Sequence, residues 1–336
     1  MTQLRFGVSL VIPCRNRPER LADCLAAVAR LDPAPLEIIV VDSHSRDPET
    51  LWEISAKYGA HFIRMNRAGA SAARNAGINR ARGDIVAFLD NDALPDTKWL
   101  AHLVAPFANA LVGCVVGRTE PDFDATQDRH AYQLLGYTRR TECVTDITPN
   151  QPNWQELACF GGIGIAPNLA IRRLLCSENQ AFCERLGPGT AIHGNEEGYL
   201  FLQILRRGYS ITYVPEALVF HPVPAPPASV LRARFCENLT AATAFVLKLI
   251  VEERGCRWMA TRYLGRKLWP VSRLWQRQPA SCQPSLVPSW RVLLARASGV
   301  ICYVRSLGEL FCSRAQPEAE YPAYDSVPAY SQEYPH

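Results

Sequence analysis

Short runs of apolar residues recur at regular intervals in the N-terminal part of this chain, and a segment with helical spacing follows each of the first three. The runs are 8–12, 37–41, 61–64 and 85–89. The helical segments between them are 17–31, 48–58 and 70–81. Strands separated by helices of this length form right-handed βαβ units, so the sequence predicts a mostly parallel α/β sheet flanked by helices.

Polar side chains follow three of these predicted strands, at the point where each strand ends. The clusters are Arg15-Asn16-Arg17, Asp42-Ser43-His44-Ser45 and Asp90-Asn91-Asp92. Parallel strands bring their carboxyl ends to one edge of a sheet, and α/β proteins bind ligands at that edge. We therefore expect the three clusters to contribute to one site.

Asp90 and Asp92 follow the fourth predicted strand with one residue between them. Residues two apart in an extended segment point to the same side. Carboxylate oxygens are the ligands that Mg²⁺ and Mn²⁺ prefer, so this pair is able to hold a divalent cation against a diphosphate. Taken alone, the pattern also fits a helix cap or a turn at the end of a strand.

A second α/β block follows the first. Its predicted strands are 112–117, 211–214 and 217–220, and its predicted helix is 196–207. Residues 120–156 show no clear periodicity and predict a long loop. A chain of 336 residues fits about two domains, or one large domain with an extension. The prolines after His221 predict a stiff hinge, which gives a first domain at 1–224.

Charge is unevenly distributed after this hinge. Residues 225–314 hold 14 Lys and Arg against 4 Asp and Glu, a net charge of +10, and read as basic amphipathic helices. Residues 315–336 are acidic and predict a disordered tail. The basic helices either lie on an anionic membrane surface or present a solvated face while packing on the first domain. No nucleic-acid reader motif accompanies the charge, so we expect no nucleic-acid partner.

The 12 cysteines are scattered without a CxxC pair, which argues against a zinc site and favours reduced thiols in a cytoplasm. We find neither a signal peptide nor an uncharged apolar run of about 18 residues. The sequence therefore predicts a cytoplasmic protein, with peripheral association at the inner face of the cell membrane as a further expectation from the basic helices.

Five stretches together resemble the motifs of the family 2 glycosyltransferases, which have the GT-A fold. They are 11–17, 39–47, 69–77, 90–92 and 194–197, and their order and spacing also fit that family. The resemblance covers residues 1–221. It implies a metal-dependent, inverting enzyme that moves a sugar from a nucleotide-diphosphate sugar to an acceptor hydroxyl, on a glycan or a lipid-linked saccharide, as in polysaccharide biosynthesis.

The resemblance also implies roles for individual residues. The nucleotide-sugar ligands are expected to be Pro13, Arg15, Asn16, Asp42, Arg74, Asn75 and Asp90. The metal ligands, for Mn²⁺ or Mg²⁺, are expected to be Asp92, Asp90 and His221. Several of these residues have a purely structural alternative: an Asx turn for Asp42, a helix–sheet contact for Arg74, and a core or loop position for His221.

The family places an acidic pair at the start of a helix, where its second member is usually the catalytic base. Here that pair is Glu196-Glu197, so the resemblance implies Glu197 as the base and leaves Glu196 as the alternative. The second glutamate departs from the family's usual aspartate. This departure keeps open another reading, in which the protein binds nucleotide sugars without catalysing transfer. The donor base, whether uracil, guanine or thymine, also stays open.

Overall fold

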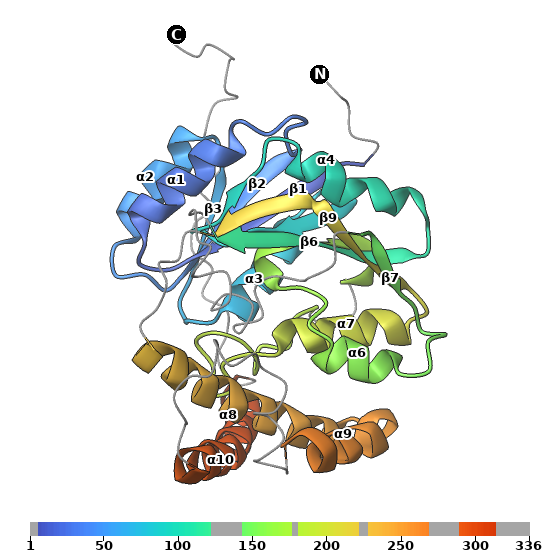
Figure 1. The fold of residues 1–336 in the computed structure, drawn as a ribbon. Coiled ribbons are helices and arrows are strands. Elements are labelled where there is room, and N and C mark those ends of the chain that lie inside the picture. Colours follow the sequence, from blue (N-terminus) through green and yellow to red (C-terminus); the bar gives the residue numbers. More distant parts are fainter. Residues whose placement is uncertain (1–5, 122–142, 177–180, 222–227, 269–288, 314–336) are drawn as a thin grey trace.

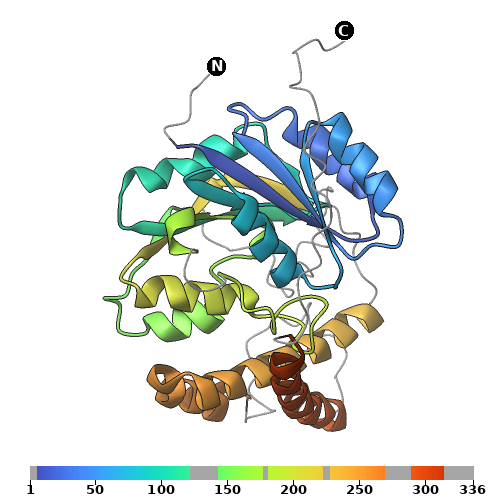
Figure 2. The ribbon, with the colours of Figure 1, turned by 180° about the vertical axis from the view of Figure 1, so that it is seen from behind.

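The computed structural model describes residues 6–121, 143–176, 181–221, 228–268 and 289–313 (Figure 1). Among these residues, a nine-stranded mixed sheet forms the centre of the molecule. Helices cover both faces of the sheet, and the helices that follow residue 228 form a further layer below it (Figures 1 and 2).

The first half of the sheet is parallel, as predicted. Its strands are β1 (Val8–Cys14), β2 (Glu37–Ser43), β3 (His61–Met65) and β4 (Ile85–Phe88). The helices between them are α1 (Pro18–Val28), α2 (Pro48–Lys57) and α3 (Ala70–Arg80). Proline begins both α1 and α2, where its missing N–H costs no helical hydrogen bond.

The second half of the sheet mixes strand directions. Its strands are β5 (Leu94–Pro95), β6 (Val112–Pro121), β7 (Thr145–Ile147), β8 (Leu169–Arg172) and β9 (Ser210–His221). β8 lies antiparallel between β4 and β6, whereas β6 and β9 are parallel. The order is β3-β2-β1-β4-β8-β6-β9-β5, with β7 also paired to β9. The expected fold class, a mixed and mostly parallel sheet flanked by helices, is confirmed.

Two expectations for this half are wrong. The two predicted strands 211–214 and 217–220 are one strand, β9, which passes through Pro215. Val214 pairs with Gly117 and Leu218 pairs with Arg118, so the residues between them bulge out of the ladder, and a bulge tolerates proline. The predicted loop 120–156 is interrupted by β7 and by the first turn of α6 (Trp154–Phe160), because a three-residue strand is too short to show a period. Residues 122–142 of this prediction lie outside the described ranges.

The two faces of the sheet carry separate hydrophobic clusters. In β1, Leu10 and Ile12 pack with Leu21 of α1 on one face, and Val11 packs with Ala73 of α3 on the other. Alternate residues of a strand point to opposite faces, and a strand buried on both sides is therefore apolar throughout. This arrangement explains the continuous apolar runs in the sequence.

The C-terminal layer consists of α8 (Ala228–Glu252), α9 (Arg257–Tyr263) and α10 (Ser289–Ser313). Phe245 and Leu249 of α8 belong to the same hydrophobic cluster as Leu200 of α7 (Glu196–Arg206). The helical layer thus packs directly on the first part of the chain. The predicted hinge and the predicted tail at 315–336 lie outside the described residues, and the division at 224 stays a prediction. None of the helices in the described ranges is long and apolar enough to span a bilayer.

Candidate active site

Asp90, Asp92 and His221 meet at the edge of the sheet where β4 and β9 end. Each offers one ligand atom, and these atoms lie within 4.8 Å of one another. Strand β5 brings these three residues together. The chain turns after Asp92 into β5, and Leu94 of β5 pairs antiparallel with Phe220, the neighbour of His221. One short strand therefore places His221 beside Asp90 and Asp92, although these residues are far apart in the sequence.

Two basic side chains contact Asp92. His221 Nε2 lies 3.2 Å from Asp92 Oδ1, and Arg17 Nη1 donates to Oδ2 at 2.5 Å. Burial by itself raises the pKa of Asp92, but the hydrogen bond and charge of His221 and the charge of Arg17 outweigh it and lower that pKa. Asp92 is thus held in its ionised form. Two carboxylates and an imidazole fit a hard or borderline divalent cation such as Mg²⁺ or Mn²⁺.

Arg74 links this cluster to the acidic pair. Its side chain is 3% exposed, and it projects from α3, where small residues allow the helix to approach the sheet. Nη2 donates to Asp90 Oδ1 at 3.2 Å, and Nη1 donates to Glu196 Oε1 at 3.3 Å. The guanidinium also lies over the ring of Phe182, 5.4 Å from its centroid. One buried cation thus bridges two carboxylates that are distant in sequence.

Glu196 and Glu197 begin α7, directly after Asn195, and their environments differ. Glu196 is buried. Burial, and next the charge of Glu197, raise the pKa of Glu196 to about 8, although Arg74 opposes the shift. Glu197 is half-buried, and its Oε1 accepts a hydrogen bond from Ala166 N at 2.9 Å. The two neighbouring carboxylates therefore have separate partners and separate access to solvent.

The loops after β1 and β2 are tied together beside Asp42. Ser45 N donates to Asp42 Oδ1 at 2.9 Å, one residue further along the chain than in the Asx turn given as the structural alternative. Asn16 N donates to Ser45 Oγ at 2.9 Å, and Arg46 N donates to Asn16 Oδ1 at 2.8 Å. Asp42 Oδ2 is buried, has no hydrogen-bond partner within the described ranges, and lies 3.9 Å from Arg64 Nε. The loops form a fixed cradle with one unsatisfied buried acceptor.

The remaining residues predicted for the nucleotide lie in different surroundings. Pro13 is buried in β1, opposite Val41, and Arg15 is exposed just beyond that strand. Asn75 bonds the backbone of Phe182 with both ends of its amide, at 2.8 and 3.0 Å, and also reaches Glu184 at 3.2 Å. Asn75 thus fixes the loop that carries Phe182 against α3.

The structure adds groups that sequence reasoning did not single out. Ala166 contributes only its backbone N–H to Glu197, and such a contact leaves no signal in a sequence. Phe182 supplies a ring beneath Arg74 and packs edge-to-face on Phe88 of β4, with centroids 5.2 Å apart. The loop around Phe182 has no periodicity, so only its position in space reveals its part in the site.

Comparison with known proteins adds independent findings. The profile of a family described as “Glycosyl transferase family 2” matches residues 9–173. The chain is 24% identical over 323 residues to “Glycosyltransferase AglE” of Haloferax volcanii, with 90% of this chain and 98% of AglE covered. It is 26% identical over 276 residues to an N-acetylglucosaminyltransferase of Mesorhizobium japonicum, with 79% of this chain and 63% of that protein covered. The chain thus spans less than two thirds of this second relative.

Solved structures share the fold at low sequence identity. The mannosyltransferase PcManGT from Pyrobaculum calidifontis, in complex with GDP-Man and Mn²⁺, superposes with a TM-score of 0.57 at 20% identity, covering 93% of this chain and 81% of PcManGT. Residues 1–349 of TarS from S. aureus superpose with a TM-score of 0.53 at 14% identity, covering 91% of this chain and 92% of that one.

Proposed function

This chain belongs to glycosyl transferase family 2 and has the GT-A fold, and we propose that it is a metal-dependent, inverting glycosyltransferase. It would move a hexose-type sugar from a nucleotide-diphosphate sugar to an acceptor hydroxyl on a glycan or a lipid-linked saccharide. One observation carries the proposal: Arg74 joins the Asp90–Asp92–His221 cluster to the acidic pair at the start of α7.

The cluster suits the diphosphate end of a donor. Asp92, Asp90 and His221 would hold Mn²⁺ or Mg²⁺ through two oxygens and a nitrogen. When bound, such a cation neutralises the charge that develops on a departing diphosphate. Arg17 is half in solvent, so it is able to leave Asp92 and pair with a phosphate oxygen instead.

The cradle of the β1 and β2 loops suits the nucleoside. Among the described residues, Asp42 Oδ2 accepts no hydrogen bond and has only Arg64 Nε at 3.9 Å, and a buried acceptor of this kind is costly unless a donor arrives. A ribose hydroxyl or a base imide supplies that kind of donor. Arg15 and Asn16 flank the same loops, and Pro13 shapes the end of β1.

Glu196 and Glu197 have different roles in this proposal. Glu197 acts as the base that takes the proton from the acceptor hydroxyl, because it is half-buried and directly follows the buried Glu196. Glu196 acts as a positioning residue that orients Arg74 between the pair and Asp90. A base on the face opposite the leaving group gives inversion in a single displacement.

The relatives support this class of reaction. Their printed descriptions name a glycosyltransferase and an N-acetylglucosaminyltransferase, and the structural neighbour PcManGT holds GDP-Man with Mn²⁺. TarS has been seen with UDP. All of these descriptions concern glycosyl transfer or its nucleotide ligands, so a nucleotide sugar is the donor class that we propose here.

Replacement of Glu197 by Gln tests the proposal. We expect unchanged affinity for a nucleoside diphosphate with Mn²⁺, measured by calorimetry, together with a fall in kcat of about 10²- to 10⁴-fold, because the acceptor proton loses its base. Glu216→Gln removes an exposed glutamate from β9 and is the matched control, with wild-type rates expected.

Each other outcome has a defined meaning. Wild-type turnover in Glu197→Gln rejects this residue as the base. Nucleotide-sugar binding without turnover or donor hydrolysis in the wild type favours the non-catalytic binding protein. If no nucleoside diphosphate binds with or without Mn²⁺, the assignment of the cluster and of the cradle is wrong.

A further inference from the structure

Helix α10 presents an apolar face to solvent along most of its length. Its inner face packs on α8 through Val292, Ala295 and Tyr303, which are buried. On the outer face, six large apolar residues recur at the spacing of a helix and are 47–59% exposed: Trp290, Leu293, Leu294, Val300, Ile301 and Val304. We call these six residues the apolar stripe. A surface helix ordinarily turns charged or polar residues to water on this side.

Arginines border the stripe. Residues 289–308 include Arg291, Arg296 and Arg305 and contain no Asp or Glu. Arg291 and Arg305 are exposed, and their separation of about four helical turns places them on one side of the helix. An apolar stripe with a cationic border is the pattern of a helix that lies in the surface of an anionic bilayer.

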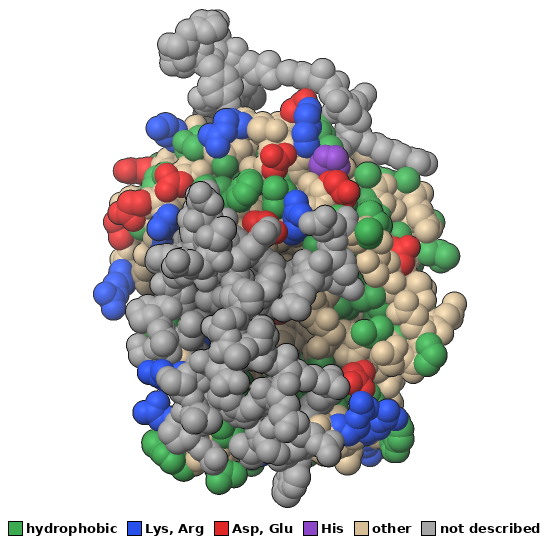
Figure 3. Space-filling view, viewed as in Figure 1, with side chains coloured by type: hydrophobic (Ala, Val, Ile, Leu, Met, Phe, Trp, Pro, Cys, Tyr) green, Lys and Arg blue, Asp and Glu red, His purple; other side chains and the backbone are tan. Residues whose placement is uncertain are grey.

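Helix α9, which packs on α8 as α10 does, carries a second exposed tryptophan. Trp258 is 73% exposed, and the guanidinium of Arg262 lies over its ring, 5.2 Å from the centroid. Tryptophan and arginine are both favoured where hydrocarbon meets water. In Figure 3, hydrophobic and basic side chains lie together at the lower left and the lower right of the molecule, over the layer formed by α8, α9 and α10 in Figure 1.

A partly buried ion pair ties this layer to the loop that precedes α7. Arg185 donates to both carboxylate oxygens of Glu252 in α8, at 2.9 and 2.8 Å, and to Ser306 Oγ in α10 at 2.9 Å. Two residues further along the chain, Gly187 packs against Glu196 so closely that an added Cβ would lie 2.9 Å from its Cδ. A surface that holds α10 would therefore also orient the start of α7.

A pocket of about 380 Å³ opens between α8 and α10. Its lining includes Trp290 and Leu294 of the stripe, Glu237 and Thr240 of α8, and His193. His193 lies in the loop that leads directly into Glu196 and Glu197, so one wall of the pocket comes from the segment that carries the acidic pair.

We propose that the apolar stripe of α10 inserts into the surface of an anionic bilayer and that the adjoining pocket receives an acceptor carried on a membrane lipid. The pocket part rests on the proposed transferase function, whereas the membrane contact does not. The charge of the arginine border favours a bilayer with acidic headgroups over a neutral one.

Vesicle co-sedimentation of the full chain tests the membrane contact. The probes are phosphatidylcholine vesicles with or without about 30% phosphatidylglycerol, at low and high salt. We expect binding to the anionic vesicles only, and a loss of affinity of at least about tenfold in the double variant Leu293→Glu/Ile301→Glu. The matched control is Leu111→Glu/Leu174→Glu, since those leucines are 64% and 62% exposed outside α10.

A second pair of substitutions tests the arginine border. Arg291→Gln/Arg305→Gln is expected to remove the preference for anionic vesicles and most of the salt dependence. Calorimetry with a nucleoside diphosphate and Mn²⁺ should give wild-type affinity for every α10 variant. If that nucleotide fails to bind even the wild type, the proposed function fails and the vesicle result still stands. Circular dichroism checks that each variant is folded.

Two outcomes overturn the membrane contact. The first is wild-type protein that remains in the supernatant with anionic vesicles at low salt. The second is equal vesicle binding by wild type and Leu293→Glu/Ile301→Glu. A wild-type dimer that this variant converts to monomer, measured by light scattering without vesicle binding, assigns the stripe to a second copy of the chain and also rejects the proposal.

Discussion

Arg74 Nη1 lies 3.3 Å from Glu196 Oε1, and both side chains are almost completely buried. The other nitrogen of the same guanidinium contacts Asp90. Three positions that are far apart in sequence are thus fixed relative to one another by a single cation. Since α3, β4 and α7 each supply one of them, the geometry of the site depends on how these three elements pack.

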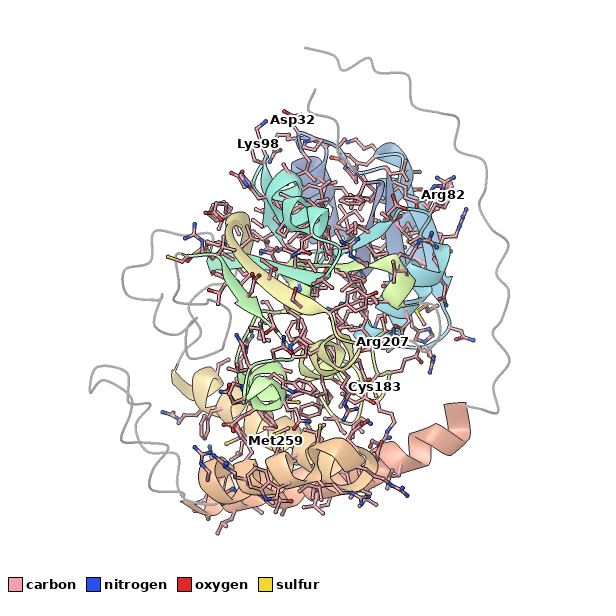
Figure 4. The ribbon with its side chains drawn as sticks, turned by 90° about the vertical axis from the view of Figure 1, so that its right-hand side faces the viewer. Asp32, Arg82, Lys98, Cys183, Arg207 and Met259 are labelled. Carbon is pink, nitrogen blue, oxygen red and sulfur yellow. The ribbon has the colours of Figure 1, made fainter. Side chains whose placement is uncertain are left out.

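Loss of Arg74 should be costly for folding. Arg74→Met leaves the Asp90 carboxylate without its cation and the buried Glu196 carboxyl without its hydrogen-bond donor, and the loss of a buried polar or charged partner is destabilising. We expect the free energy of unfolding in urea to fall by at least about 2 kcal/mol. The matched control is Lys98→Met, which breaks the exposed pair with Asp32 that Figure 4 labels at the top of the view.

That control should change stability by less than about 1 kcal/mol, because exposed ion pairs contribute little. Lys98 and Asp32 are 53% and 47% exposed, so water solvates both charges when the pair is lost. Equal losses in the two variants would contradict the structural role that we assign to Arg74.

The raised pKa of Glu196 predicts a pH dependence of stability. The carboxyl titrates at about 8 in the folded protein, against an ordinary value of 4.5, so the folded state holds a proton that the unfolded chain has released. The free energy of unfolding should therefore decrease as pH rises between these two values, with a contribution of up to about 1.4 kcal/mol per pH unit.

Glu196→Gln should remove this part of the slope, since glutamine does not titrate. Urea unfolding at several pH values between 5 and 8 measures it, and Glu216→Gln, at an exposed position, should keep the wild-type slope. A slope unchanged in Glu196→Gln would show that Glu196 is ionised throughout this range.

Arg17 should compete with a cation for Asp92. Its Nη1 donates to Asp92 Oδ2, while the arginine side chain is 58% exposed. Arg17→Gln is expected to raise the affinity for Mn²⁺ alone by about two- to fivefold, because an exposed ion pair no longer has to break. Asp92→Asn should lower the same affinity by at least about tenfold, since it removes a charged ligand.

Titration of free Mn²⁺ by electron paramagnetic resonance measures these affinities. Arg20→Gln is the control for the change in net charge, because Arg20 lies exposed one turn further along α1. Weaker Mn²⁺ binding in Arg17→Gln would mean that Arg17 supports the cluster instead of competing for it.

Gly77 allows α3 to lie close to β1. A Cβ at this position would stand 2.4 Å from Val11 Cγ1 and 2.9 Å from Cγ2. Gly77→Ala should therefore destabilise the protein by about 1–3 kcal/mol, through overpacking. Adding Val11→Ala should relieve the clash, so the double variant is expected to lose less than the sum of the two single losses in urea unfolding.

Gly308→Ala is the control for replacement of a helical glycine. Among the described residues, nothing lies within 4 Å of the added Cβ in α10, so alanine should stabilise the protein by up to about 1 kcal/mol through its higher helix propensity. If the free energy of unfolding changes no more in Gly77→Ala than in Gly308→Ala, α3 can shift away from β1 at little cost.

Much of the first half of the fold was predictable from sequence. The strands β1 to β4 and the helices between them have lengths and apolar patterns that local residue order dictates, and their parallel arrangement follows from the connections. The sequence also predicts that Asp42 and Asp90 lie at the carboxyl edge of the sheet, because side chains at the ends of parallel strands share one edge.

Local pattern could not predict the second half as well. β9 is a single strand in spite of Pro215, because a bulge against β6 removes the proline from the ladder. β7 and β5 are too short to show a period, yet β5 places His221 beside Asp92. These features depend on pairing between segments that are more than 60 residues apart.

The residue order by itself determined which chemistry the chain carries: oxygen ligands after buried strands, an acidic pair at a helix start, and a basic C-terminal segment. Tertiary packing alone decided which carboxylate is buried against Arg74, which one stays half in solvent, and where the apolar face of α10 points. The reason is physical. Side-chain types and their spacing are local properties, whereas desolvation and ion pairing depend on neighbours that only the folded chain brings together.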